Sequence, residues 1–302
     1  MATTDKTAST SAPRADVLLK RQTADGVLVL TLNDPATRNA LGTELSDDLV
    51  RTVNEFADNP DLRRLVITGA GQAFCSGANV RGFKKRIEDA EKNKSDQAAA
   101  AKSESRPGPW EALDPVYGAR ERGGQRMGPE IVRVLHNLQK PTIAAVNGAA
   151  YGLGCGIALA CDVRIAGRAA RFSEAFIRNG LVPADGSTWQ LPKLIGMANT
   201  LWLQYTGDAV DAEQALRMGL VNEVADDDVL LDRAVERATR LAKGPIYAMG
   251  LIKQLVHQAF QQDLAEHLAL ASRAQDLARK TQDHKEGVAA FLEKRPPRFV
   301  GH

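Results

Sequence analysis

The sequence is poor in cysteine, in long apolar runs and in excess charge of either sign, and each shortage excludes a class of protein. Only three of its 302 residues are cysteine and none is spaced as CxxC, which argues against a disulfide framework or a zinc site. No run of roughly 18 apolar residues occurs, so no membrane span is expected. Because 39 Lys and Arg residues are balanced by 37 Asp and Glu residues, the net charge of +2 does not predict binding to nucleic acid.

Signals for metal binding and for export are also missing. The five histidines form no metal-binding spacing such as HExxH, so no metal is expected. Residues 1–15 are small and polar and contain no apolar segment of the kind found in signal peptides. We therefore expect a disordered N-terminal tail on a cytoplasmic protein.

The chain does contain a 44% share of hydrophobic residues, arranged in alternating strand and helix patterns. Residues 16–226 are predicted to form a core domain in which continuous apolar strands alternate with helices, a pattern typical of an α/β fold with a largely parallel sheet. A polar, low-complexity insertion interrupts this domain at residues 83–127. Residues 227–302 have a helical pattern almost throughout and are expected to form a C-terminal helical region.

Two turns, within residues 64–80 and 141–162, share one design: a strand, then small residues and glycine, then a helix. A helix that begins in this way leaves its first backbone N–H groups unpaired, and glycine lets a ligand approach them. Two such turns that aim one N–H each at the same oxygen would form an oxyanion hole for an acyl group that becomes an enolate. The alternative is that these glycines only permit tight packing of helix on sheet.

A dinucleotide site is a competing interpretation of the second turn, because Gly152, Gly154 and Gly156 follow a strand and precede a helix. That fingerprint requires its third glycine at position 157, where the chain has Ile157. Residues 147–151 also separate the strand from the glycines. The spacing therefore argues against NAD binding.

Several ordered motifs resemble the crotonase, or enoyl-CoA hydratase/isomerase, superfamily. The resemblance is carried by residues 38–41 (RNAL), 73–78 (AFCSGA), 141–162, 206–221 and 283–295 (DHKEGVAAFLEKR). The first segment is similar to the CoA-contacting segment of the family, the next two to its two oxyanion turns, and the last to its C-terminal signature. The resemblance extends from Val17 to Phe299, except over the insertion.

This resemblance implies a crotonase-like spiral of ββα units with a helical C-terminal region, residues 227–302, that mediates trimerisation, and assembly as a homotrimer or as a homohexamer built from two trimers. It implies an acyl-CoA substrate and no cofactor besides the coenzyme A of that substrate. The backbone N–H groups of Ala78 and Leu153 would bind the thioester oxygen; Leu153 replaces the usual glycine, which a main-chain donor tolerates. The residues expected to contact CoA or the acyl group are Arg38, Ala40, Ala73, Ser76, Phe176, Phe291 and Lys294.

Some of these expected contacts have simpler alternatives. In the family, the positions of Phe291 and Lys294 commonly reach CoA from a neighbouring subunit, and a lysine suits a phosphate-rich ligand. Arg38 would lie near the nucleotide end of CoA. The alternative for both charged side chains is that they are solvated surface charges.

The chain departs from the family at the two acid/base positions. Hydratases of the family use two glutamates there, because hydration needs a carboxylate pair that holds one water. This chain has Gly156 and Phe176 instead, and neither can move a proton. Asp185 lies on a loop from which some isomerases supply an aspartate base, but it would serve equally well as a helix N-cap. Glu174, two positions before Phe176, is a weaker candidate.

One carboxylate suffices to move a proton between two carbons of a CoA-bound enolate. The sequence therefore favours double-bond isomerisation with Asp185 as the base, and Phe176 would line an apolar acyl pocket. The alternatives are an enoyl-CoA hydratase with other acid/base residues, a CoA-ester hydrolase or lyase, and an acyl-CoA-binding protein without catalysis.

Overall fold

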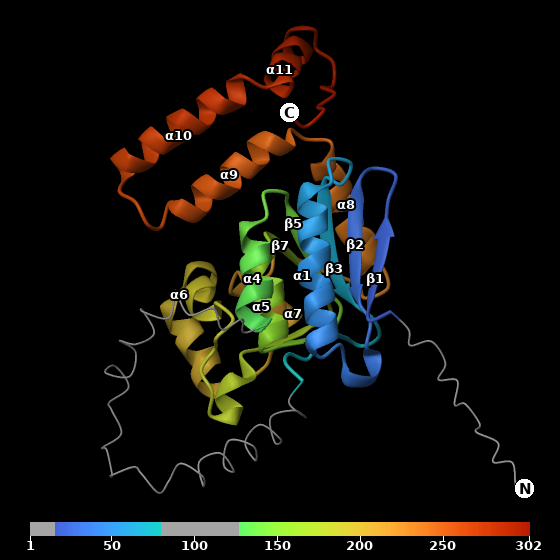
Figure 1. Cartoon of the computed structure of the whole chain (residues 1–302). Helices are drawn as coiled ribbons and strands as arrows, with labels where there is room; N and C mark the ends of the chain where they lie inside the picture. The colour runs from blue at the N-terminus through green and yellow to red at the C-terminus, as the bar shows by residue number, and fades with distance from the viewer. Residues whose placement is uncertain (1–15, 80–126) are drawn as a thin grey trace, which may run out of the picture.

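The structure, a computed structural model, describes residues 16–79 and 127–302 (Figure 1). The tail predicted at residues 1–15 and nearly all of the insertion predicted at 83–127 lie outside the described residues. None of the helices in the described ranges is both long and apolar enough to cross a membrane.

The larger of two sheets has six strands in the order β1-β2-β3-β5-β7-β10. Its strands are β1 (Leu18–Gln22), β2 (Val27–Leu32), β3 (Arg64–Gly69), β5 (Thr142–Val146), β7 (Val163–Gly167) and β10 (Glu223–Ala225). β1 and β2 form the predicted antiparallel hairpin, and every other neighbouring pair is parallel. The parallel strands are buried on both faces, which explains why the sequence shows continuous apolar runs there.

The smaller sheet contains β4 (Ala73–Cys75), β6 (Ala149–Tyr151), β8 (Arg171–Ser173) and β9 (Val210–Asp211), in that order. Three times in succession the chain leaves a strand of the larger sheet and enters a strand of the smaller one: β3 to β4, β5 to β6 and β7 to β8. This repetition is the predicted spiral of ββα units, and the α/β fold class is confirmed.

Helices cover both faces of the larger sheet (Figure 1). On one face lie α1 (Thr43–Asp58), α4 (Met127–Asn137) and α5 (Leu153–Ala160), which pack against one another. On the other face lies α8 (Leu230–Ala242), which contacts β2, β3, β5 and β7. α8 places Leu230, Ala234, Ala238 and Ala242 on one buried stripe, because residues four apart share a helix face.

The remaining helices flank the sheets or extend away from them, and α6 (Ser187–Thr206) and α7 (Ala212–Arg217) also contribute buried residues to the main hydrophobic core. α6 is interrupted at Gly196, whose φ of 76° and ψ of 165° are not helical. α7 and the short 3₁₀ helices η1 (Pro35–Thr37) and η4 (Ala175–Asn179) connect strands. α9 (Ile246–Gln258), α10 (Leu264–Arg279) and α11 (Gln282–Leu292) extend away from the sheets (Figure 1). The predicted C-terminal region is therefore helical, with its first helix, α8, on the core and its last two helices away from it.

Candidate active site

The two glycine-containing turns lie against each other at the carboxyl end of the parallel strands. A Cβ atom on Gly77, whose φ is +94°, would stand 2.6 Å from the Tyr151 carbonyl oxygen and 3.6 Å from the Leu153 nitrogen. A Cβ atom on Gly154 would lie only 2.2 Å from the Cys75 carbonyl oxygen. A Cβ atom cannot lie 2.6 Å or 2.2 Å from a carbonyl oxygen. The absence of a side chain at Gly77 and Gly154 therefore allows the two turns to meet.

The amides of Ala78 and Leu153 both lie at this contact. Leu41 binds the chain on either side of Ala78: its nitrogen donates to the Gly77 oxygen at 2.8 Å, and its oxygen accepts from the Asn79 nitrogen at 3.1 Å. Because successive N–H groups of an extended chain point to opposite sides, the Ala78 N–H points away from Leu41. Leu153 is the first residue of α5, where an N–H has no partner within the helix. Neither N–H donates to a backbone acceptor within residues 16–79 and 127–302.

The segment before α1 fixes the first turn. The side-chain amide of Asn39 is fully buried and donates to the carbonyl oxygens of Ala73 at 2.8 Å and Ala70 at 3.0 Å. The Ser76 nitrogen donates to the Arg38 oxygen at 3.0 Å, and the Ser76 hydroxyl donates to the Thr37 oxygen at 3.0 Å.

Four of the residues expected to contact CoA are thus brought together. Arg38 is exposed, Ala40 and Ser76 are half-buried, and Ala73 is buried. Sequence reasoning missed Asn39, although asparagine is among the few residues that tolerate its φ of 58°.

The carboxyl group of Asp185 occupies the space beside Gly156. A Cβ atom on Gly156 would stand 2.4 Å from Asp185 Oδ2 and 2.9 Å from Asp185 Cγ. Asp185 is 1% exposed. Because Gly156 lies in the first half of α5, only a few residues after the Leu153 amide, the loop before α6 supplies a buried carboxyl group to the same end of α5.

Glu174 is linked to Asp185 by Ser187. Glu174 follows β8 and is 2% exposed. Its Oε2 atom accepts a hydrogen bond from the Ser187 hydroxyl at 2.7 Å, and the Ser187 backbone N–H donates to Asp185 Oδ1 at 3.1 Å. The other two oxygens, Glu174 Oε1 and Asp185 Oδ2, are buried without a hydrogen-bond partner among the described residues. A single residue therefore holds one oxygen of each carboxyl group and leaves the other free.

Burial controls the protonation of this pair. Burial, followed by the charge of Asp185, raises the pKa of Glu174 to about 8, against the opposing effect of the Ser187 hydrogen bond. Burial also raises the pKa of Asp185, and the hydrogen bond from the Ser187 backbone N–H opposes it. Two neighbouring buried carboxyl groups resist double ionisation, so the pair retains one proton at neutral pH.

Asp185 also contributes to the start of α6. The N-cap of α6 is Gly186, with a φ of 83°, and the first helical N–H, that of Ser187, is bonded by Asp185 Oδ1. The hypothesis that Asp185 is the N-cap residue is therefore wrong, although its Oδ1 atom accepts from the first N–H of α6 while Oδ2 has no hydrogen-bond partner among the described residues. The aromatic ring of Phe176 lies beside the second turn, 3.6 Å from the position of a Cβ atom on Gly152.

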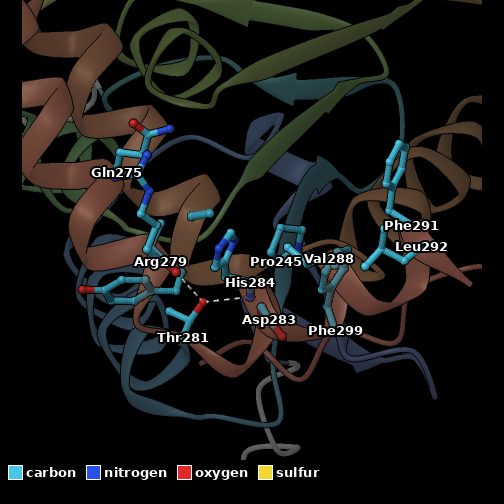
Figure 2. Close-up of a pocket in the computed structure, with 14 residues that line it drawn as sticks. Pro245, Gln275, Arg279, Thr281, Asp283, His284, Val288, Phe291, Leu292 and Phe299 are labelled. Carbon is cyan, nitrogen blue, oxygen red and sulfur yellow. Dashed lines mark hydrogen bonds between the residues drawn. The ribbon is translucent and has the colours of Figure 1, made fainter.

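Phe291 and Lys294 are not brought to these turns within one chain. Both are exposed, at the end of α11 and just after it, and Phe291 lines a groove of about 600 Å³ (Figure 2). Figure 2 shows Phe291 and Leu292 at one end of this groove and Arg279 and Thr281 toward the other. Beyond α11 the Val300 oxygen accepts from Arg63, directly before β3, so the C-terminus lies at the amino end of the sheet, opposite the two turns.

Comparisons with known proteins give a consistent result. A family model described as enoyl-CoA hydratase/isomerase matches residues 22–128 and 117–302. The chain is 36% identical over 278 residues to a 1,2-epoxyphenylacetyl-CoA isomerase of Escherichia coli (91% of this chain, 95% of that protein). It is 33% identical over 287 residues to a crotonyl-CoA hydratase of Syntrophomonas wolfei (94% and 98%). A solved structure titled as a putative enoyl-CoA hydratase from Streptomyces coelicolor superposes with a TM-score of 0.78 at 32% identity (99% and 100%).

Proposed function

Because the chain belongs to the enoyl-CoA hydratase/isomerase family, and is thus an enzyme acting on an acyl-CoA, we propose that it moves a carbon–carbon double bond of its substrate, with Asp185 as the base. The observation that carries this proposal is the position of Asp185 Oδ2, which is buried in the space beside Gly156 and has no hydrogen-bond partner within residues 16–79 and 127–302. The 1,2-epoxyphenylacetyl-CoA isomerase among the relatives agrees with an isomerase reaction.

The backbone N–H groups of Ala78 and Leu153 bind the thioester oxygen in this proposal. When a proton leaves the carbon next to the thioester, negative charge moves onto that oxygen, and two fixed N–H donors stabilise it without reorganisation. The loss of one such donor typically raises a barrier by about 3 kcal/mol. The start of α5 adds the partial positive charge of a helix N-terminus.

Asp185 carries the proton from one carbon to another. Its Oδ2 atom accepts the proton as the C–H bond breaks, and the electron pair delocalises over the enolate. The same oxygen returns the proton to a carbon two positions further along, so the double bond moves and the net atom balance is unchanged. No water and no cofactor other than the CoA of the substrate take part.

Hydration is a second candidate, favoured by one observation. Glu174 Oε1 and Asp185 Oδ2 are both buried and unpaired among the described residues, and hydration requires two carboxyl groups around one water. Several relatives are named as hydratases, including the crotonyl-CoA hydratase. Isomerisation is preferred because the Ser187 hydroxyl already engages Glu174, while Asp185 alone occupies the space beside Gly156.

Binding of the CoA portion is proposed to use two chains. Arg38, Ala40, Ala73 and Ser76 lie at the first turn of one chain, and Phe176, beside the second turn, would border the acyl group. Phe291 and Lys294 would come from a second copy, since they lie away from the turns of their own chain. Assembly as a homotrimer, or as two trimers, is supported by apolar side chains of α9 and α10 that are more than half exposed: Ile252 58%, Val256 55%, Leu264 74% and Leu268 57%.

The test is an assay with two substrates. Incubation with a 3-enoyl-CoA should produce the absorbance of a conjugated thioester, whereas crotonyl-CoA should keep its absorbance. Asp185→Asn should lower turnover of the 3-enoyl-CoA about 100- to 10,000-fold, as expected for loss of a general base, with CoA affinity preserved. Loss of crotonyl-CoA absorbance would instead identify a hydratase. Unchanged turnover by Asp185→Asn would remove Asp185 from the mechanism.

A further inference from the structure

We infer that Glu174 is a positioning residue for Asp185: it keeps the one proton of the buried pair and, through Ser187, leaves Asp185 ionised and oriented as the base. This inference rests on the proposed role of Asp185. It assigns Glu174 no contact with the substrate. Three observations carry it: the bridge through Ser187, the lack of a counterion among the described residues, and the different donors that face the two carboxyl groups.

The bridge joins three successive segments of the chain. Glu174 lies between β8 and η4, Asp185 lies on the loop before α6, and Ser187 is the first residue of α6. Ser187 donates its hydroxyl to Glu174 at 2.7 Å and its backbone N–H to Asp185 at 3.1 Å. Because both bonds come from one residue, a change in the charge of Glu174 acts directly on the residue that orients Asp185.

No cation compensates this pair in the described part of the chain. The groups that face it are the Cys155 thiol from α5, Ser187 itself, and Gln204 from the end of α6, whose Nε2 atom lies 3.4 Å from the Ser187 hydroxyl. Arg164 on β7 is buried nearby, but its guanidinium donates to the carbonyl oxygens of Cys161 at 2.6 Å and Leu220 at 2.8 Å. Two uncompensated negative charges in such a site are costly, so one proton remains.

The donors decide which carboxyl group keeps the proton. Asp185 accepts from a backbone N–H, which is fixed and can only donate, so it favours the ionised form. Glu174 accepts from the Ser187 hydroxyl, which can rotate and accept a hydrogen bond from a neutral acid instead, and the Cys155 thiol beside it is only a weak donor. The raised pKa of Glu174, about 8, agrees with this assignment.

A consequence for the reaction follows at alkaline pH. When Glu174 loses its proton, the site gains a second negative charge beside the position where the enolate forms. That charge opposes the charge developing on the thioester oxygen, so the rate should fall above the pKa of Glu174. In the proposed mechanism the acidic limb of the pH profile belongs to Asp185 and the alkaline limb to Glu174.

The first test is the pH profile of kcat/KM for three variants. Glu174→Gln should abolish the alkaline limb, because a neutral amide cannot titrate. Ser187→Ala should move that limb to higher pH by about one unit, because ionised Glu174 loses a hydrogen bond. Ser173→Ala is the matched control, since this neighbouring buried hydroxyl donates to the Gly207 oxygen and not to either carboxyl group, and its profile should match the wild type. An alkaline limb that persists in Glu174→Gln would overturn the inference.

The second test needs neither a substrate nor a variant. Infrared spectra of the unmodified protein should show the carbonyl stretch of a protonated carboxylic acid at pH 7 that disappears above pH 8. Labelling of glutamate with ¹³C should shift this band, and labelling of aspartate should not. A band that shifts only with labelled aspartate, or the absence of any such band, contradicts the role given to Glu174. If the band is found but no acyl-CoA is isomerised, the proposed function fails while the protonation of Glu174 stands.

Discussion

Asp185 Oδ2 lies 2.4 Å from the point where a Cβ atom on Gly156 would stand, so these two positions cannot both carry a side chain in this arrangement. The resemblance to hydratases expects a glutamate at position 156. In this chain the carboxyl group comes instead from a loop nearly thirty residues further along and enters the same space. The absence of a side chain at Gly156 and the burial of Asp185 are therefore one structural feature.

Gly156→Ala tests this relationship. The added methyl group would overlap the carboxyl group of Asp185 and displace it, at a cost of about 1–3 kcal/mol typical of overpacking. We expect kcat to fall about 10- to 100-fold, because the displaced base no longer meets the substrate. Gly42→Ala is the control, since a Cβ atom there meets nothing within 4 Å. Wild-type kcat in Gly156→Ala would mean that Asp185 can move without consequence and is not the base.

Asn39→Ala should destabilise the first turn and with it the whole core. The buried amide donates to the carbonyl oxygens of Ala70 and Ala73, and its removal takes this bond from both and leaves the Ala73 oxygen with the longer bond, 3.4 Å, from the Asn147 side chain. Alanine also adopts a φ of 58° less readily than asparagine does. We expect a loss of about 2–4 kcal/mol in the free energy of unfolding, measured by urea denaturation. Asn33→Ala, which removes an exposed amide bonded to the Asp16 oxygen, should cost much less.

Lys294→Ala should weaken CoA binding if a second chain supplies Lys294 to the site. One charge-assisted contact to a phosphate corresponds to about 1–2 kcal/mol, or about a 5- to 30-fold increase in the dissociation constant for CoA. Calorimetric titration with CoA measures this change. Lys285→Ala, which removes an exposed lysine on α11 itself, should leave the dissociation constant unchanged. Equal constants for Lys294→Ala and the wild type would exclude the contact.

Acid should loosen the packing of α9 on the core, because His136 of α4 stacks on His257 of α9 with 4.1 Å between the ring centroids. Burial, and then the charges of His257, Lys253 and Lys193, lower the pKa of His136 to about 4 from its ordinary value of 6.5. Between these values the unfolded chain binds more protons than the folded one, so stability falls as the pH decreases from 6.5 toward 4.

Urea denaturation at a series of pH values between 4 and 7 checks whether stability falls on acidification. The decrease in unfolding free energy on acidification should be smaller in His136→Gln than in the wild type. His284→Gln, a change to an exposed histidine on α11, should keep the full decrease. If the unfolding free energy of His136→Gln decreases on acidification as much as that of the wild type, the acid sensitivity belongs to other groups.

The sequence predicted the parts of the fold that depend on local pattern. Apolar strands such as Thr142–Val146 and the glycines of the two turns are visible along the chain, because burial and backbone geometry select residue types directly. The contacts of Asp185 could not be predicted in the same way, because one of its oxygens accepts from the Ser187 N–H and the other lies in the space beside Gly156. Nor does any local pattern show that Ser187 reaches back to Glu174, since that contact depends on how β8 and α6 are placed together.

The interruption of α6 at Gly196 has a consequence for the exposed end of that helix. In a straight helix the 17 positions between Ser187 and Gln204 would span about 25 Å, but the break turns the second half back, so that Gln204 reaches the Ser187 hydroxyl at 3.4 Å. The neighbours of Gln204 on the surface, Trp202 and Tyr205, are 66% and 71% exposed. The break at Gly196 therefore gives the second half of α6 two functions, since it exposes two aromatic rings and also places the Gln204 amide beside the Ser187 hydroxyl that binds the buried acid pair.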